Sequence, residues 1–268
     1  PGPGRRDPEA AEPAEEGGCV LDHLQRGVQL EAKREIIVDC FHRLGRLDVG
    51  ELLGGPDDDG GETGYRNKIR LFASPAGYYG TVKPGTHEVL PLERSVLMPE
   101  PFNEAILPFL RFLPPMEQIV VRLDGRGGFL LQLYGQRQRQ KLLKKLLRAD
   151  GSGIEVPEGC AGIVFNNLPV RGRDYLVMQV AGHKYRVGAK SFFQANLEVT
   201  ESIVATLRRW LQDARQEGGL LADMYCGVGL FPLALGDLFE RILAADSDGH
   251  AVRDARNNIE RDAATKDR

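Results

Sequence analysis

The stretch LLADMYCGVGL, residues 220–230, decides the fold of this chain of 268 residues. It begins as a short apolar strand over residues 220–225, which contains Asp223, then turns through two glycines and opens a helix. A second apolar strand, residues 242–246, ends at Asp246, and residues 249–261 follow as a second helix. Strand, helix, strand, helix with continuously apolar strands predicts the opening of a parallel α/β sheet.

The glycine turn favours S-adenosylmethionine over a dinucleotide as its ligand. A dinucleotide fingerprint reads GxGxxG directly after the strand, whereas Pro232 stands at the third glycine position here. Asp223 would repel a pyrophosphate, but S-adenosylmethionine carries an ammonium and a sulfonium instead. Gly227 and Gly229 let the backbone and the next helix approach a ligand closely, and Asp246 can accept both ribose hydroxyls of an adenosine. An ordinary βαβ turn with a capping aspartate is the competing interpretation.

Composition and charge are those of an ordinary globular protein. Lys and Arg number 35 against 38 Asp and Glu, a net charge of −3, and 42% of the residues are apolar. These values exclude a wholly disordered chain. The sequence contains no run of about 18 apolar residues, so it predicts no membrane span. The four cysteines lack CxxC spacing. We therefore expect a reducing, intracellular compartment, the cytoplasm before an organelle, and no membrane partner.

Four regions follow from the patterns along the chain. Residues 1–18 contain Pro, Gly, Ala and charges without a large apolar residue and predict a disordered tail. Residues 19–53 predict a helical segment, with its helix over 20–45, and residues 59–190 a β-rich α+β domain. Residues 191–268 hold two strand–helix units, whereas a doubly wound sheet has about five or six strands. We therefore expect an incomplete α/β domain and a chain that is a fragment of a longer protein.

Five motifs, in order along the chain, resemble those of the RNA (uracil-5-)-methyltransferases. They are GGC at 17–19 with His23, Gln29, Leu30 and Lys33 after it, GYRNK at 64–68, the hairpin with PGTHE at 84–88, KSFFQAN at 190–196, and DMYCGVG at 223–229. Five matches in order are far more specific than any one of them. The resemblance implies a truncated class I, Rossmann-like methyltransferase domain, preceded by a small β-rich RNA-binding domain.

The resemblance also implies an activity, which is methyl transfer from S-adenosylmethionine to C5 of a uridine in tRNA or ribosomal RNA. In this family a cysteine thiolate adds to C6, which activates C5, and a carboxylate base later removes the C5 proton. The family has both groups beyond the cofactor motif. Neither occurs in this chain, so we expect no catalytic residue here and no turnover by the chain alone. Cys226 is interpreted as a small buried residue.

The family's motifs assign the expected site residues. Gln194 matches the glutamine of the cofactor and target-base pocket, Tyr225 the aromatic residue that packs on the cofactor, and Asp246 the ribose contact. The complete expected cofactor site is Gln194, Asp223, Tyr225, Gly227, Gly229 and Asp246.

Basic residues indicate where RNA would bind. Arg66, Lys68 and Arg70 alternate on a predicted strand, Tyr65–Ala73, and would share one face. The basic run QRQRQKLLKKLLR, residues 136–148, is either a phosphate-contacting helix or a solvated helix face, and the sequence leaves both open.

An iron–sulfur cluster, which some family members hold with four cysteines, is not expected. Only Cys19 matches that set, and Ser95 stands where some members have another cysteine. One thiol cannot fill a four-cysteine site. The scattered histidines do not predict any other metal site.

Two other functions stay open at this stage. One is a non-catalytic RNA-binding protein that kept the fold and lost the chemistry, which would bind RNA without a cofactor. The other is a class I methyltransferase for a small molecule, against which the β-rich residues 59–190 argue, because a small substrate needs no such platform.

Overall fold

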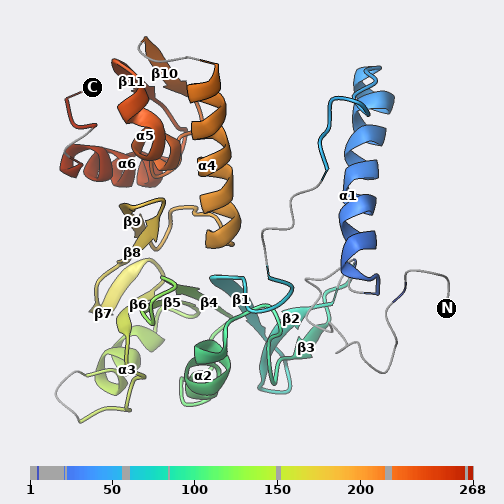
Figure 1. The fold of residues 1–268 in the computed structure, drawn as a ribbon. Coiled ribbons are helices and arrows are strands. Elements are labelled where there is room, and N and C mark those ends of the chain that lie inside the picture. Colours follow the sequence, from blue (N-terminus) through green and yellow to red (C-terminus); the bar gives the residue numbers. More distant parts are fainter. Residues whose placement is uncertain are drawn as a thin grey trace.

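The structure is a computed structural model that describes residues 5, 21, 23–55, 61–83, 85–148, 152–214, 219–262 and 265–267. Apart from Arg5, the predicted tail at 1–18 lies outside these ranges, and so does Cys19. Within the described ranges, no helix combines the length and the hydropathy that crossing a membrane requires. In Figure 1 a large sheet crosses the lower half of the molecule, and helices α4, α5 and α6 stand above one part of it.

The large sheet has seven strands in the order β3-β2-β1-β4-β5-β6-β7. Neighbouring strands are antiparallel, except for β5 and β6, which are parallel. The strands are β1 (Lys68–Ala73), β2 (Tyr79–Val82), β3 (Val89–Pro91), β4 (Gln118–Leu123), β5 (Phe129–Tyr134), β6 (Cys160–Phe165) and β7 (Leu168–Gly172).

One sequence-based assignment in this sheet is wrong. The strand β1 begins at Lys68 and not at Tyr65, so Arg66 does not alternate with Lys68 and Arg70 on one strand. The reason is that the Arg66 amide donates to the carbonyl of Leu97, which holds the chain before Lys68 against a loop.

One face of the sheet packs on helices α2 (Leu107–Leu110) and α3 (Arg139–Leu146). The alternating residues Ile119, Val121 and Leu123 of β4 point to this side and are buried there. Leu143 and Leu147 bring the apolar stripe of α3 into the same cluster. Burial of these side chains fixes the register of the sheet, because a slip by one residue would expose them.

The N-terminal helical segment stands apart from this core. Its helix α1 (Arg26–Cys40) continues as a wider π-helical turn over Phe41–Gly45. No described residue of either piece is buried, and the exposed side chains include Ile36, Phe41 and Leu44. Figure 1 shows α1 as a separate upright helix on the other side of the molecule from α4 and α6.

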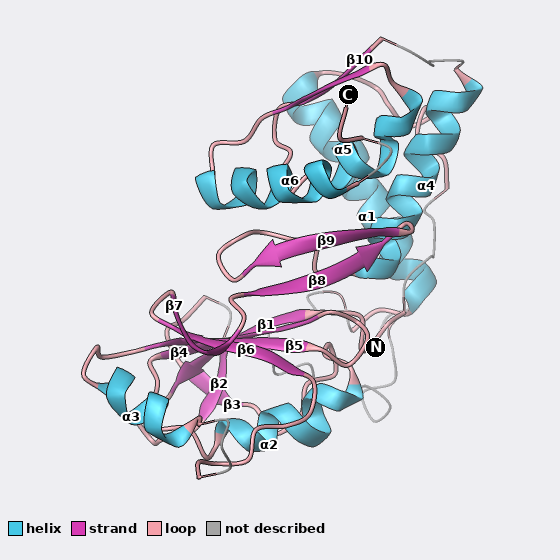
Figure 2. Cartoon of the chain, turned by 90° about the vertical axis from the view of Figure 1, so that its left-hand side faces the viewer, coloured by secondary structure: helices cyan, strands magenta, loops and turns pink. Residues whose placement is uncertain are grey.

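The C-terminal part begins with a hairpin that contacts both halves of the chain. Strands β8 (Tyr175–Val180) and β9 (His183–Gly188) pair antiparallel. Their buried side chains share one cluster with Leu130 and Val164 of the large sheet and with Leu230 and Leu233 of the next helix. Figure 2 shows the hairpin between the large sheet and α6.

The predicted parallel strand pair is present. Strands β10 (Leu220–Asp223) and β11 (Arg241–Ala244) run parallel, with Asp223 opposite Ala244. The helices around them are α4 (Leu197–Asp213), α5 (Leu230–Leu235) and α6 (Gly249–Arg261). The sequence pattern over residues 192–212 predicts that α4 starts at Phe192. It starts five residues later because the Asn196 side chain caps it by accepting from the Val199 amide.

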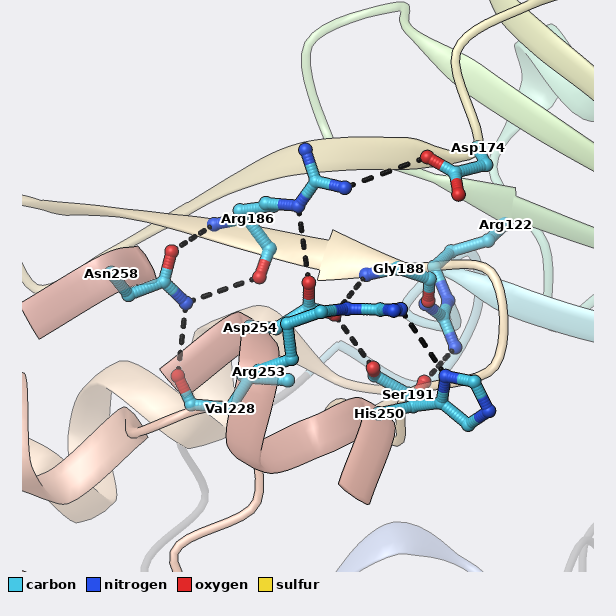
Figure 3. Close-up of polar contacts among 10 residues, drawn as sticks. All are labelled: Arg122, Asp174, Arg186, Gly188, Ser191, Val228, His250, Arg253, Asp254 and Asn258. Carbon is cyan, nitrogen blue, oxygen red and sulfur yellow. Dashed lines mark hydrogen bonds and ion pairs between the residues drawn. The ribbon is translucent and has the colours of Figure 1, made fainter. Parts of the chain in front are cut away.

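A buried carboxylate joins α6 to the hairpin (Figure 3). Asp254 is 1% exposed. It accepts hydrogen bonds from the Gly188 amide at 2.7 Å and the Ser191 hydroxyl at 2.6 Å, and it pairs with the Arg186 Nε at 3.1 Å. One turn later, Asn258 accepts from the Arg186 amide and donates to the Arg186 carbonyl. These contacts lock α6 onto β9 along its length.

A buried arginine connects the same turn to the large sheet. Arg122 of β4 is 2% exposed, and it donates to the carbonyls of Gly188 and Ser191 at 3.0 and 2.7 Å. Burial lowers the pKa of Arg122 to about 10, and the charge of Asp254 acts in the opposite direction. At that pKa the guanidinium stays charged at neutral pH.

We predict that Asp254→Ala lowers the free energy of unfolding by about 3 kcal/mol or more. The substitution leaves the Gly188 amide, the buried Ser191 hydroxyl and the Arg186 Nε without the acceptor that they share. Urea denaturation followed by circular dichroism measures the change. Glu260→Ala, on the exposed side of the same helix, serves as the control and should change stability by less than about 0.5 kcal/mol. Similar stabilities for the two variants would refute the role of Asp254.

Candidate functional site

The glycine turn after β10 is tied to the end of β11. The amide of Cys226 donates to the Ala245 carbonyl, and the amide of Ala245 donates to the Asp223 carbonyl. The Asp246 Oδ2 accepts from the Gly227 amide at 2.9 Å. The structure therefore brings both predicted carboxylates, which are 23 residues apart in the sequence, to one edge of the parallel strand pair.

The carboxylate of Asp246 is held in its charged form. Backbone amides of Asp248, Gly227 and Ser247 donate to it, and they hold the pKa of Asp246 below its ordinary value. The two carboxylate oxygens have four lone pairs together, so the carboxylate keeps an acceptor for a hydrogen bond from a ligand. Asp246 is thus an ionised acceptor at neutral pH.

Asp223 has an acceptor that the described chain does not use. Its Oδ1 accepts from the Tyr225 amide at 3.2 Å. Its Oδ2 is buried and accepts no hydrogen bond from any described residue. A buried unpaired carboxylate oxygen is costly, so this atom fits a ligand that brings a donor or a positive charge. The Tyr225 side chain is 91% exposed beside it and offers an aromatic face.

The two glycines have different structural roles. Gly227 has φ +54° and nothing within 4 Å of the position of a Cβ, so the chain there is open to a ligand. Gly229 has φ +87°, and a Cβ would lie 3.5 Å from Ala255 of α6. Both are left-handed conformations that glycine adopts without strain. Gly229 therefore serves the packing of α6, and Gly227 leaves space above the turn.

Gln194 is fixed through its backbone by the GYRNK segment. The Asn67 side chain donates to the Gln194 carbonyl at 2.8 Å, and the Asn67 amide donates to the Ala195 carbonyl at 2.8 Å. Asn67 is buried, whereas Gln194 is exposed. The side chain of Gln194 therefore projects from an anchored loop. In the part of the chain that the structure describes, no hydrogen bond joins this side chain to the Gly227 turn.

Two of the three predicted RNA-binding residues lie together on the large sheet. Lys68 and Arg70 are on the face of β1 opposite to the main core, and Lys68 is directly across from Arg122 of β4. Burial, followed by the positive charges of Arg122 and Arg70, lowers the pKa of Lys68 to about 8. Arg66, before the strand, is half-buried.

Three functional positions were missed from the sequence. Asn67 and Arg122 hold the Ser191–Ala195 loop, and Asp254 holds its first residue. The sequence does contain a pattern that indicates burial of Asp254. One face of the helix α6 consists of four buried residues, namely Ala251, Asp254, Ala255 and Asn258. Polar residues on a buried helix face indicate a hydrogen-bond network.

Metal-ligand clusters are absent from the part of the chain that the structure describes, where no three His, Cys, Asp or Glu side chains gather for a metal ion. Cys19 is outside that part. Ser95 is buried, and its hydroxyl accepts from the Met98 amide at 3.1 Å. Its role in this structure is thus to hold a loop turn.

Comparison with known proteins gives one family and a set of relatives. Residues 137–266 match the family model described as tRNA (Uracil-5-)-methyltransferase. An uncharacterized RNA methyltransferase of Thermosynechococcus vestitus is 26% identical over 91% of this chain and 60% of its own length. Another, of Aquifex aeolicus, is 28% identical over 96% of this chain and 61% of its own length. The chain thus spans about three fifths of the relatives that it matches.

A solved structure shares the fold. The crystal structure of Pyrococcus abyssi tRNA (uracil-54, C5)-methyltransferase in complex with S-adenosyl-L-homocysteine matches with a TM-score of 0.68 and 18% identity. The match covers 97% of this chain and 63% of that chain. The predicted fold class, a Rossmann-like α/β domain preceded by a β-rich domain, is confirmed.

We predict that iodoacetamide at about pH 7.5 labels Cys40 at least ~10-fold faster than Cys160 or Cys226, because the thiolate is the reactive form. Cys40 is exposed. Burial raises the pKa of Cys160 to about 11, and burial with the charges of Asp223 and Asp246 raises the pKa of Cys226. Peptide mass spectrometry over time gives the rates, and the same experiment in urea should remove the difference. Labelling of Cys226 as fast as Cys40 would contradict its assignment as a buried, unreactive thiol.

Proposed function

Since residues 137–266 match the family model described as tRNA (Uracil-5-)-methyltransferase, we propose that the protein transfers a methyl group from S-adenosylmethionine to C5 of a uridine in RNA. The observation that carries the proposal is the pair of carboxylates around an open glycine turn: Asp223 is the last residue of β10, and Asp246 lies two residues after the end of β11. The substrate that we favour is tRNA, which the matching family model names.

Each site residue has a defined part in binding. Asp246, ionised and fixed by the Gly227 amide, accepts the two ribose hydroxyls. The unpaired Asp223 Oδ2 faces the positively charged end of the ligand. Tyr225 packs its exposed ring on the bound cofactor, and Gln194 reaches the target base from its anchored loop. When it is bound, the cofactor supplies an electrophilic methyl group on a sulfonium.

The RNA approaches over the β-rich domain in this proposal. Lys68 and Arg70 contact its phosphates from the sheet face next to Arg122, and Arg66 contacts it from the preceding segment. The anchor from Asn67 to Gln194 couples this face to the loop that reaches the target base. A base in an RNA loop has to leave its stack to enter such a pocket.

We predict that the chain binds S-adenosylhomocysteine and that Asp246→Asn weakens this binding at least ~10-fold. Hydrogen bonds to an ionised acceptor contribute about 1.5–3 kcal/mol each, and 1.4 kcal/mol is a factor of ten. Isothermal titration calorimetry measures both affinities. Asp248→Asn is the matched control, since asparagine keeps the helix cap that Asp248 makes with the His250 amide. RNA binding by a chain without affinity for the cofactor would favour the non-catalytic alternative.

We also predict that RNA affinity falls between about pH 7 and about pH 9, because Lys68 loses its charge there. Its pKa of about 8 is below the ordinary 10.5, so the charged form and its phosphate contact are present below that pH and are lost above it. Lys68→Arg should abolish the fall, since arginine stays charged throughout. Fluorescence anisotropy with a labelled RNA at constant salt gives the profiles. The same pH profile in the wild type and in Lys68→Arg would exclude Lys68 as a contact.

A further inference from the structure

The helix α3 carries a dense positive surface that the proposed reaction does not use. From residue 136 to residue 148 the chain has six basic residues and no acidic one. All six are exposed or half-buried, and no described residue forms an ion pair with any of them. These residues, which we call the α3 surface, are Arg137, Arg139, Lys141, Lys144, Lys145 and Arg148.

The strand β7 extends the α3 surface and fixes its end. Arg171 donates from its Nη1 to the carbonyls of Leu147 and Arg148, both at 3.3 Å. This contact satisfies carbonyls at the end of α3 that the helix itself leaves unpaired. The helix is therefore anchored on one side by Leu143 and Leu147 and presents its cations on the other.

A hollow opens at the N-terminal end of the α3 surface. Its volume is about 490 Å³, and its lining is Arg137, Gln140, Phe165, Asn166, Asn167 and Leu168. Asn166 and Asn167 both adopt left-handed conformations, with φ of +45° and +68°. The Asn166 side chain donates to the Gly135 carbonyl at 2.7 Å and accepts from the Gly135 amide at 3.2 Å. The wall of the hollow is thus fixed before any ligand arrives.

The position of this surface suits a long ligand that also reaches the glycine turn. In Figure 2, α3, β7 and the arrowhead of β9 lie toward the same side of the molecule. The arrowhead of β9 is Gly188, which contacts Asp254 in the first half of α6. The loop with Asp246 leads directly into that half of α6. An extended polyanion can therefore follow one side of the molecule from α3 to the cofactor turn.

We propose that the α3 surface and its hollow form a second RNA-binding site, which holds phosphates of the substrate RNA away from the modified uridine. Unpaired cations contact the backbone. The arginine and the amide groups that line the hollow supply donors and acceptors for a phosphate or a base edge. The site deepens the proposed function and rests on it, since the RNA is the same molecule.

The test compares a full-length tRNA with a short single-stranded uridine oligonucleotide, which is too short to reach both sites. The variant K141Q/K144Q/K145Q should bind tRNA at least ~10-fold more weakly and the oligonucleotide within about 2-fold of the wild type. The slope of log affinity against log salt for tRNA should become less steep by about 2 to 3, since each lost phosphate contact contributes about 0.7–0.9. Arg137→Gln, at the hollow, should weaken tRNA binding about 3-fold by itself.

A control variant separates a local site from general charge. K33Q/K184Q/R209Q removes the same charge from exposed residues on α1, β9 and α4, and it should leave tRNA affinity within about 3-fold. An equal loss in the control, an equal loss for both RNAs, or no loss in the α3 variant would overturn the proposal. Binding of S-adenosylhomocysteine, which is measured in parallel, should be unchanged in every variant. Its absence from the wild type would count against the cofactor proposal and not against this site.

Discussion

One buried carboxylate, on the helix α6, connects this helix to the hairpin and to the turn after it. Asp254 collects donors from β9, from the turn after it, and from the side chain of Arg186 (Figure 3). Arg122, reaching from the large sheet, holds the carbonyls of the same turn. Residues from β4, from the turn after β9 and from α6 therefore meet in one buried network of hydrogen bonds. Loss of one partner there would leave a buried charge uncompensated, which lowers the free energy of unfolding.

The contacts of Asp254 and Arg122 also fix the position of the candidate site. The helix α6 starts just after Asp246 and passes within van der Waals distance of Gly229, so its position sets both sides of the glycine turn. The loop that carries Gln194 starts at Ser191, which Asp254 and Arg122 both hold. The residues proposed to bind the cofactor are thus positioned by residues that do not touch it. This separation lets the site stay open while its frame stays rigid.

The sequence predicts this molecule best where one local signal dominates. The parallel strand pair and the glycine turn are marked by runs of apolar residues and by turn residues, and both are present. The strand β7 is hard to predict from the sequence, because Pro169 and Gly172 interrupt it and its side chains are largely exposed, as is usual for an edge strand. Asp254 and Asn67 were missed because their partners are distant in the sequence. The structural roles of these two residues depend on tertiary contacts, which a local sequence pattern does not show.

The contact between Asn67 and Gln194 joins residues 127 positions apart. During synthesis from the N-terminus, Asn67 leaves the ribosome on the order of ten seconds before Gln194, given elongation at about 5–20 residues per second. A small sheet folds within milliseconds to seconds. The last strand of the large sheet ends at Gly172, 22 residues before Gln194, which corresponds to about 1 to 4 seconds of synthesis. The sheet can therefore fold before the loop that Asn67 anchors has been made, and the newly made loop then meets a folded surface. The order of the two regions along the polypeptide thus favours correct assembly of the site during translation.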